Sequence, residues 1–280
     1  MIRRRRLLAA AVLAAATIGV GFAIAGVSGG DGKKQPTATA SAAPKPFRII
    51  FPEGFTRLQM ADRVASVAEI AKRERGRTPR LTKAGYLAAS AGTRFIPGLG
   101  RHPLEGFLFP ATYQFTARTP ARRLVNEQIK AFERSWHGID LRYARSKNLT
   151  PYDVLTIASM VEREAVAPEE RPKIARVIYN RLHARMPLGI DATIRYAFHL
   201  PGTESLRRSQ LEADNPYNTR KRLGLPPTPI ANPGLASMQA AAHPVEGDWL
   251  YFVRKPDKVH HFFTASERDF INYKNAHGFG

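Results

Sequence analysis

The feature that most constrains this chain lies at its N-terminus, where four arginines (Arg3 to Arg6) precede a charge-free stretch from Leu7 to Gly30. Leu7 to Val27 is almost wholly apolar, and a helix needs about 20 such residues to cross a bilayer. A basic block on the N-terminal side of a span stays in the cytoplasm. Residues 1–30 are therefore predicted to form a cytoplasmic stub and a single-pass membrane anchor, with the remainder of the chain outside the cytoplasm.

A cleaved signal peptide is the alternative. The triplet Ala23-Ile24-Ala25, followed by Gly26, fits the pattern of small residues at a cleavage site. The apolar run continues past this triplet to Val27, which favours an uncleaved anchor in the cell membrane. Both interpretations place the rest of the chain in an extracytoplasmic compartment.

Composition narrows the partners and the chemistry. The 280 residues include 43 Lys and Arg against 23 Asp and Glu, a formal net charge of +20, which indicates an anionic partner. An exported domain meets little nucleic acid, so anionic lipids and wall polymers are the expected partners. The chain has no cysteine, which excludes disulfide scaffolds, thiolate zinc sites and a cysteine nucleophile.

The exported part divides by composition. Residues 31–46 (DGKKQPTATASAAPKP) form a Pro/Ala/Thr/Ser linker without apolar periodicity. Residues 47–100 are predicted to be a small α/β unit, with a strand over 47–51, a helix from Thr56 to about Arg73 and a second helix over 81–91. Gly and Pro concentrate over 98–110, which places a boundary there.

Residues 101–280 are predicted to be a mainly helical domain that ends in a β-hairpin. Helix starts are indicated by Thr119-Pro120, Thr150-Pro151, Pro168 and Asn232-Pro233. Residues 249–254 and 259–264 are β-rich and flank a Lys-Pro-Asp-Lys turn, and Ser266 with Asp269 predicts a final helix. Strands at the ends with helices between them indicate an α+β fold. Residues 190–230 show little periodicity, as expected of a long functional loop.

A glutamate on an apolar helix face is the sharpest local feature. At about 100° per residue, Glu164 falls within about 20° of Ile157 and about 60° of Val161. Burial raises the pKa of a carboxyl, and a general acid at neutral pH needs such a raised pKa. The competing interpretation is a structural ion pair with an arginine of the following helix. Arg163 is expected to point away from this face.

Other reactive groups are less promising. Neighbouring residues on a strand face opposite sides, so His260 and His261 cannot both point into one metal site. Ser159 lacks the G-x-S-x-G context of a hydrolase nucleophile, and the chain has no phosphate-binding glycine loop. We therefore expect neither a metal nor a cofactor.

Several motifs together resemble the MltG/YceG-like endolytic murein transglycosylases. They occur in the family's order over about residues 100–270, and FPEGFTRLQMADRV before them matches more weakly. The motifs are PLEGFLFPATYQF (103–115), ASMVEREAVAPEERPKIARVIYNRLHARMPLGIDATIRYA (158–197), PYNTR (216–220), GLPPTPIANPG (224–234), AAHP (241–244), WLYFV (249–253) and HHFF (260–263).

The resemblance implies a membrane-anchored lytic transglycosylase, a carbon–oxygen lyase, that cuts peptidoglycan between N-acetylmuramic acid and N-acetylglucosamine. Its products end in 1,6-anhydro-muramic acid, and its expected role is the termination of nascent strands, in association with cell-wall synthases. The catalytic glutamate of the family is the second Glu of V-E-x-E, here Glu164. The residues alone leave open a muramidase-type hydrolase and a non-catalytic peptidoglycan-binding scaffold.

The resemblance also implies supporting residues. Glu162 is expected to orient or tune Glu164 through its like charge. Glu105 belongs to the E-G-F-L-F-P motif, and Asp191 and Thr193 stand in the D-P-T stretch of the family. Each of these has a structural turn or cap as its alternative. Tyr217, Asn218 and Thr219 suit hydrogen bonding and stacking on sugars, with the same structural alternative.

This chain also departs from the family. Ala111, Gly189 and Ala192 replace the usual Asp, Gln and Pro, so the D-P-T loop is expected to differ in shape. Many members carry a longer LysM-like region, which the resemblance assigns here to residues 47–100.

Overall fold

The computed structural model describes residues 46–202 and 204–278. The predicted membrane anchor and nearly all of the predicted linker lie outside the described residues. In the part of the chain that is described, no helix is long and apolar enough to cross a bilayer.

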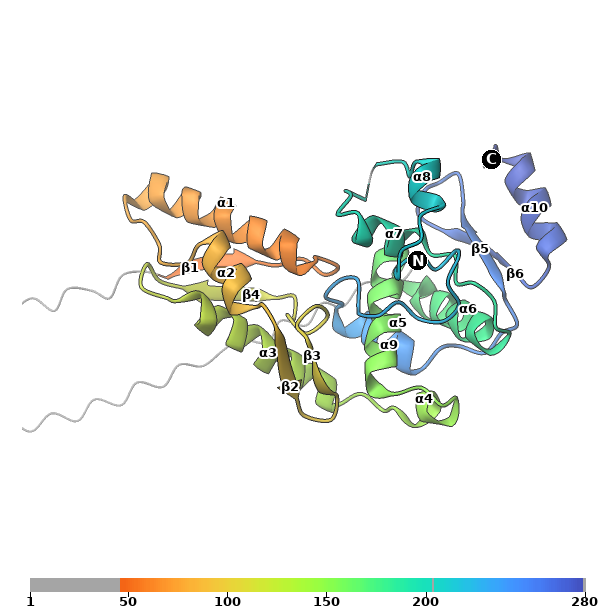
Figure 1. Cartoon of the computed structure of the whole chain (residues 1–280), viewed down its shortest axis with the longest axis horizontal. Helices are drawn as coiled ribbons and strands as arrows, with labels where there is room; N and C mark the ends of the chain where they lie inside the picture. Colours follow the sequence, from red (N-terminus) through yellow and green to blue (C-terminus); the bar gives the residue numbers. More distant parts are fainter. Residues whose placement is uncertain (1–45, 203, 279–280) are drawn as a thin grey trace, which may run out of the picture. The chain divides into compact units, whose positions relative to one another are not determined.

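Short strands and helices follow one another along the described chain (Figure 1). The strands are β1 (Phe47–Ile50), β2 (Thr93–Ile96), β3 (Gly100–Pro103), β4 (Thr112–Phe115), β5 (Tyr251–Arg254) and β6 (His261–Thr264). The helices are α1 (Arg57–Arg75), α2 (Lys83–Ala89), α3 (Ala121–His137), α4 (Arg142–Ser146), α5 (Pro151–Glu164), the 3₁₀ turn η1 (Pro168–Glu170), α6 (Arg171–His183), α7 (Asp191–Ala197), α8 (Arg208–Leu211), α9 (Leu235–Ala242) and α10 (Glu267–Ala276).

The described strands form three separate two-stranded antiparallel pairs, β1–β4, β2–β3 and β5–β6. This mixture of helices and small antiparallel sheets confirms the α+β class, and β5–β6 is the predicted C-terminal hairpin, with Arg254 opposite His261. In the first pair, Phe47 lies opposite Phe115. The segment before residue 100 therefore shares a sheet with the segment that follows it.

Most helix starts follow local capping chemistry. At α5, the Thr150 side chain accepts the N–H of Asp153, and the Asp153 carboxylate accepts the N–H of Thr150. Three predicted starts are shifted, and the one at α9 is explained below. Pro120 is the residue before α3 rather than its first residue, and Pro168 opens η1 rather than α6 itself. Proline fits both places because each lacks an intrahelical partner for its N–H.

The loop predicted over 190–230 contains two short helices. α7 has seven residues and α8 has four, which is too short for an apolar period to stand out. The prediction of no regular structure was therefore wrong over these residues.

Helix α5 is buried on every side. All of its residues from Val154 to Val161 are buried, and it packs against α6, α7 and α9 (Figure 1). A helix that is apolar all round belongs inside a core. Because α5 ends at Glu164, the first place where its side chains can meet a cavity is this C-terminal turn.

Asn232 joins three segments that lie far apart in the sequence. Its Oδ1 accepts the N–H groups of Gly106 and Leu108, each at 2.9 Å. Its Nδ2 donates to the carbonyl of Phe55 and to the carboxylate of Glu105, both at 2.9 Å. The side chain is fully buried and uses its whole hydrogen-bonding capacity. This commitment explains why α9 begins only at Leu235, later than predicted from Asn232-Pro233.

We expect Asn232→Ala to lower the free energy of unfolding by about 2–4 kcal/mol, because it leaves buried backbone N–H groups without an acceptor. Urea denaturation of the two proteins measures this difference. Asn275→Ala, an exposed position of α10, is the control and should stay within about 0.5 kcal/mol of the parent. Equal losses from the two variants would contradict a central role for Asn232.

Candidate active site

Glu164 is the last residue of α5, and Ala165 after it already has an extended backbone. Its carboxyl therefore leaves the core at the helix end, half-buried. Burial raises the pKa of Glu164, and the nearby charge of Asp191 raises it further. Arg254, the backbone N–H of Ala192 and Arg195 act in the opposite direction but do not cancel the rise. The group has the environment of a general acid.

Glu164 opens onto a cavity of about 580 Å³, here called the Glu164 cavity. Two acidic and six basic side chains line it, together with aromatic residues of the C-terminal hairpin. The acidic residues are Glu164 and Asp191, and the basic ones are Arg163, Arg181, Arg195, Arg220, Arg254 and Lys274. Such a cavity suits a neutral or anionic ligand rather than a cation.

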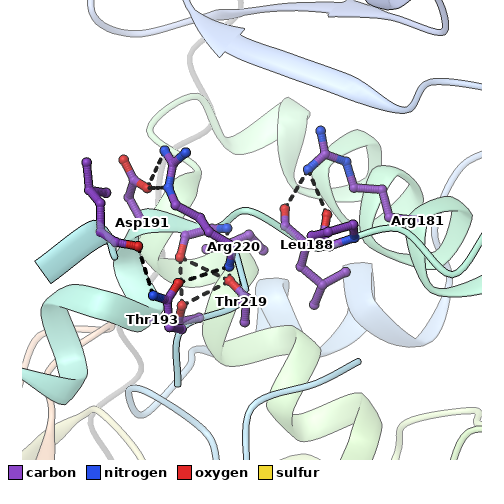
Figure 2. A network of polar contacts seen from close by, with 10 residues as sticks. Arg181, Leu188, Asp191, Thr193, Thr219 and Arg220 are labelled. Atoms are coloured by element: carbon purple, nitrogen blue, oxygen red, sulfur yellow. Dashed lines mark hydrogen bonds and ion pairs between the residues drawn. The ribbon is translucent and has the colours of Figure 1, made fainter. Parts of the chain in front are cut away.

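Asp191 lines the same cavity as Glu164, but Asp191 is already paired. Its Oδ1 accepts from Nη2 of Arg220 at 2.7 Å and from Nε at 2.8 Å (Figure 2). Asp191, at the start of α7, and Arg220, in a turn after α8, together form one wall of the cavity. Glu164 is therefore the acidic side chain of the lining without a side-chain ion pair among the described residues.

Thr193 and Thr219 lie behind this wall rather than in the cavity. The two hydroxyl oxygens are 3.1 Å apart, and Thr193 donates to the carbonyl of Ile190 (Figure 2). The backbone N–H of Ile190 donates to the Thr219 hydroxyl, and that of Gly189 donates to the Thr219 carbonyl. Gly189 has φ +63°, a left-handed conformation that suits glycine. These contacts fix the loop that carries Asp191.

Arg181 holds the same loop from its other side. Its guanidinium donates to the carbonyls of Leu188 and Pro187, and its Nε donates to the carbonyl of Leu250 next to β5. Figure 2 shows the contact of Arg181 with Leu188. Through Leu250, the loop before α7 is thereby tied to the C-terminal hairpin. Arg181 also lies 5.3 Å from the ring centre of Tyr251.

The neighbouring residues Tyr217 and Asn218 point to different surroundings and have different partners. The Asn218 amide is buried and donates to the carbonyls of Leu211 and Ala213, which shapes the turn after α8. The Tyr217 hydroxyl instead pairs with that of Thr228 at 2.9 Å. Tyr217 lines a second cavity of about 320 Å³, the Glu105 cavity.

Glu105 is the other acid with a strongly altered environment. Burial raises its pKa to about 7, against four hydrogen bonds that lower it. Both oxygens accept from the N–H of Arg57, Oε1 also accepts from Asn232, and Oε2 accepts from the Tyr196 hydroxyl. With both oxygens engaged by the protein, Glu105 is built for holding segments together rather than for proton transfer.

The two cavities are linked by a third of about 300 Å³. It shares Arg163, Ala192 and Arg195 with the Glu164 cavity, and Tyr196 and His199 with the Glu105 cavity. Because neighbouring cavities share lining residues, the three form one extended path and not a single closed pocket.

Glu162 lies apart from this path. Its carboxylate accepts the N–H of Gly234 at 3.0 Å and lies 3.6 Å from Arg171. Burial raises the pKa of Glu53, and the charge of Glu162 raises it further. Arg163, expected to point away, instead donates to the carbonyl of Gly54 and lines the Glu164 cavity.

Several lining residues have no local signal in the sequence. Arg195, Arg254 and His261 come from α7, β5 and β6, and tertiary packing alone brings them to Glu164. Nη2 of Arg254 lies 3.5 Å from the backbone carbonyl of Glu164. The excess of basic residues was the available hint, but it does not say which arginines gather. Across the described residues, no group of three His, Asp or Glu side chains is placed to hold a metal ion.

Known proteins share both this sequence and this fold. The sequence model of the YceG-like family matches residues 33–276. The chain is similar to the endolytic murein transglycosylase of Bacillus subtilis, with 42% identity over 156 residues that cover 55% of this chain and 43% of that protein. For the protein of the same name from Streptococcus pneumoniae strain R6, the identity is 33% over 244 residues, which cover 79% of this chain and 43% of the relative. The chain thus spans less than half the length of these relatives.

A crystal structure of a yceG-like protein from Listeria monocytogenes has a similar fold. The TM-score is 0.66 at 30% sequence identity, and the match covers 81% of this chain and 76% of that one.

The raised pKa of Glu164 predicts a pH-dependent effect on stability. A carboxyl whose pKa is raised by folding destabilises the native state once it is ionised, and this cost disappears below its ordinary pKa of 4.5. Glu164→Gln should therefore be more stable than the parent at about pH 8, and the difference should shrink toward about pH 4. Denaturant midpoints across this range measure it, with Glu74→Gln on the exposed face of α1 as control. A Gln variant that is less stable at the alkaline end would contradict the burial of an uncompensated carboxyl.

Proposed function

Because the chain belongs to the YceG-like family, we propose that it is an endolytic transglycosylase of peptidoglycan. The reaction cleaves the bond between N-acetylmuramic acid and N-acetylglucosamine inside a glycan strand and leaves a 1,6-anhydro-muramic acid end. The single observation that carries this proposal is Glu164, a carboxyl of raised pKa at the wall of a basic cavity. The names of the Bacillus and Streptococcus relatives support it.

Glu164 acts first as acid and then as base. Its proton moves to the glycosidic oxygen as the bond to the muramic acid anomeric carbon breaks. The 6-hydroxyl of the same sugar attacks that carbon, and its proton returns to the Glu164 carboxylate. The raised pKa keeps a proton available for the first step, and Arg254 and Arg195 stabilise the carboxylate between the steps.

The second carboxyl of the cavity favours a lyase over a hydrolase. Hydrolysis usually needs a second carboxylate, as nucleophile or to activate water. Asp191 is the other acid of the lining, and its contact with Arg220 at 2.7 Å commits one of its oxygens. An intramolecular hydroxyl needs no second carboxylate, so one unpaired acid is sufficient.

The linked cavities suit a polymer. A glycan strand extends over several sugars, and internal cleavage requires it to be held on both sides of the broken bond. The path from the Glu164 cavity to the Glu105 cavity offers tyrosines, Tyr196 and Tyr217, whose rings can pack on sugar faces. Thr193, Asn218 and Thr219 support the walls of this path from behind.

The finer features of the family are part of the same proposal. The N-terminal apolar segment would tether the catalytic part to the outer face of the cell membrane, close to newly made strands and to the synthases that extend them. Residues 47–100 would serve as a LysM-like unit. Termination of nascent strands is the role that such a position fits.

We expect Glu164→Gln to lower the rate of glycan cleavage by at least about 100-fold, since the amide cannot donate or accept the transferred proton. The assay incubates purified protein with peptidoglycan strands and identifies the ends by mass spectrometry. Glu74→Gln, remote from the cavities, is the matched control. Anhydro-ended products at the parental rate from Glu164→Gln would refute the assignment.

The same digest separates the alternatives. Reducing muramic acid ends would indicate a muramidase-type hydrolase. Parental protein that sediments with peptidoglycan but produces no new ends would indicate a binding scaffold.

Arg195 is expected to bind the carboxylates of peptide stems. Arg195 lines both the Glu164 cavity and the third cavity that links it to the Glu105 cavity. A guanidinium pairs well with a carboxylate because its donors match the two oxygens. Arg195→Gln should raise KM about tenfold on strands with peptide stems and leave KM nearly unchanged on stem-free strands. Arg145→Gln, exposed on α4, is the control. An equal increase on both substrates would exclude recognition of the stem.

A further inference from the structure

A buried histidine–glutamate pair adjoins the Glu164 cavity and has no part in the mechanism above. Nδ1 of His261 on β6 lies 2.7 Å from Oε2 of Glu170, the last residue of η1. The backbone N–H of His261 donates to both oxygens of the same carboxylate, at 2.9 and 3.1 Å. His261 is 4% exposed and Glu170 is 6% exposed. The pair joins segments 91 residues apart in the chain.

The pair fixes which ring nitrogen carries the proton. Burial lowers the pKa of His261, so the ring is neutral near pH 7. A carboxylate can only accept hydrogen bonds, so Nδ1 of His261 holds the proton and donates it to Glu170. Nε2 is then left with a free lone pair, which makes it an acceptor.

The histidine belongs to the wall of the cavity. His261 lines the Glu164 cavity, and its ring bonds to the described residues through Nδ1, the nitrogen that faces Glu170. Arg254 lies directly opposite His261 in the hairpin and reaches the backbone carbonyl of Glu164 at 3.5 Å. The rings of Phe252 and Phe263 contact the imidazole edge-on, at 5.4 and 6.0 Å between centres, and limit its rotation.

A purely structural pair explains these observations less well. Tying β6 to η1 requires only an attachment, which apolar side chains provide without the cost of burying a charge. His261 also supplies the cavity with a neutral hydrogen-bond acceptor. Six basic side chains line it as donors, Asp191 is paired with Arg220, and Glu164 is the proton donor. A sugar hydroxyl held there needs a neutral acceptor.

We propose that His261 is a substrate-binding residue whose Nε2 accepts a hydrogen bond from a sugar hydroxyl next to Glu164. Glu170 is its positioning residue, because it holds the imidazole in the tautomer that leaves Nε2 free. The identity of the ligand as a sugar rests on the proposed function. The orientation and tautomer of the ring rest on the geometry of the pair alone.

Two substitutions separate substrate binding from attachment. Asn at position 261 keeps a nitrogen near Nδ1 that can donate to Glu170 but removes Nε2. Gln places its amide oxygen near the position of Nε2 but gives up the contact with Glu170. We expect His261→Asn to lower kcat/KM on glycan strands about tenfold with little change in melting temperature. His261→Gln should regain most of the activity at a lower melting temperature.

The opposite order, with His261→Asn fully active and His261→Gln impaired, would overturn the proposal. It would show that His261 only attaches β6 to η1. Binding to glycan oligomers is measured in addition, in the Glu164→Gln background. There, His261→Asn should weaken Kd about tenfold relative to His261→Gln. This arm needs no turnover, so it stands or falls independently of whether the protein is a lyase.

Nitrogen-15 NMR of the unaltered full chain tests the tautomer without any substitution. We expect the His261 ring near pH 7 to show a protonated Nδ1 and an unprotonated Nε2. A ring protonated at Nε2, alone or at both nitrogens, would overturn the proposal.

Discussion

The buried amide of Asn232 is the contact on which the arrangement of the cavities depends. Its four hydrogen bonds reach Phe55, Glu105, Gly106 and Leu108. Residues next to Phe55 line both the Glu105 cavity and the third cavity, and Glu105 lines the first of these. A buried amide can be fully satisfied in one arrangement only, so this side chain selects a single relative position for segments that apolar contact would hold less specifically.

Helix α5 supplies the second constraint. Its middle is buried on every side, and Thr156 and Ser159 there form hydrogen bonds inside the core. The two carboxyls of its C-terminal turn, Glu162 and Glu164, face different surroundings. Glu162 accepts the N–H of Gly234 and approaches Arg171, which gives it a structural attachment. Burial raises the pKa of Glu164, and the nearby charge of Asp191 raises it further, against the lowering effect of Arg254 and Arg195. Two residues of separation along one helix thus produce two different chemical roles.

Local chemistry made much of the fold predictable. Thr150 and Asp153 cap α5 as their sequence indicates, and the hairpin follows the β-rich segments around residue 256. Predictions failed where a residue serves a distant partner. Asn232-Pro233 predicts a helix start, yet the Asn232 amide binds segments more than 120 residues earlier. Short helices such as α8 were not predicted, because four residues are too few to show a helical period of apolar residues.

The sequence by itself determined the basic charge, the α+β class, the acid on the apolar face and the order of motifs that marks the YceG-like family. These properties depend on residue type and near-neighbour spacing, which a linear chain carries in full. Only the tertiary structure decided which cations surround Glu164, that Asp191 is paired with Arg220, and that His261 is held by Glu170. Those contacts join residues 29 and 91 positions apart, and their energies depend on burial and on distances of a few ångströms. Neither quantity exists until the chain has packed.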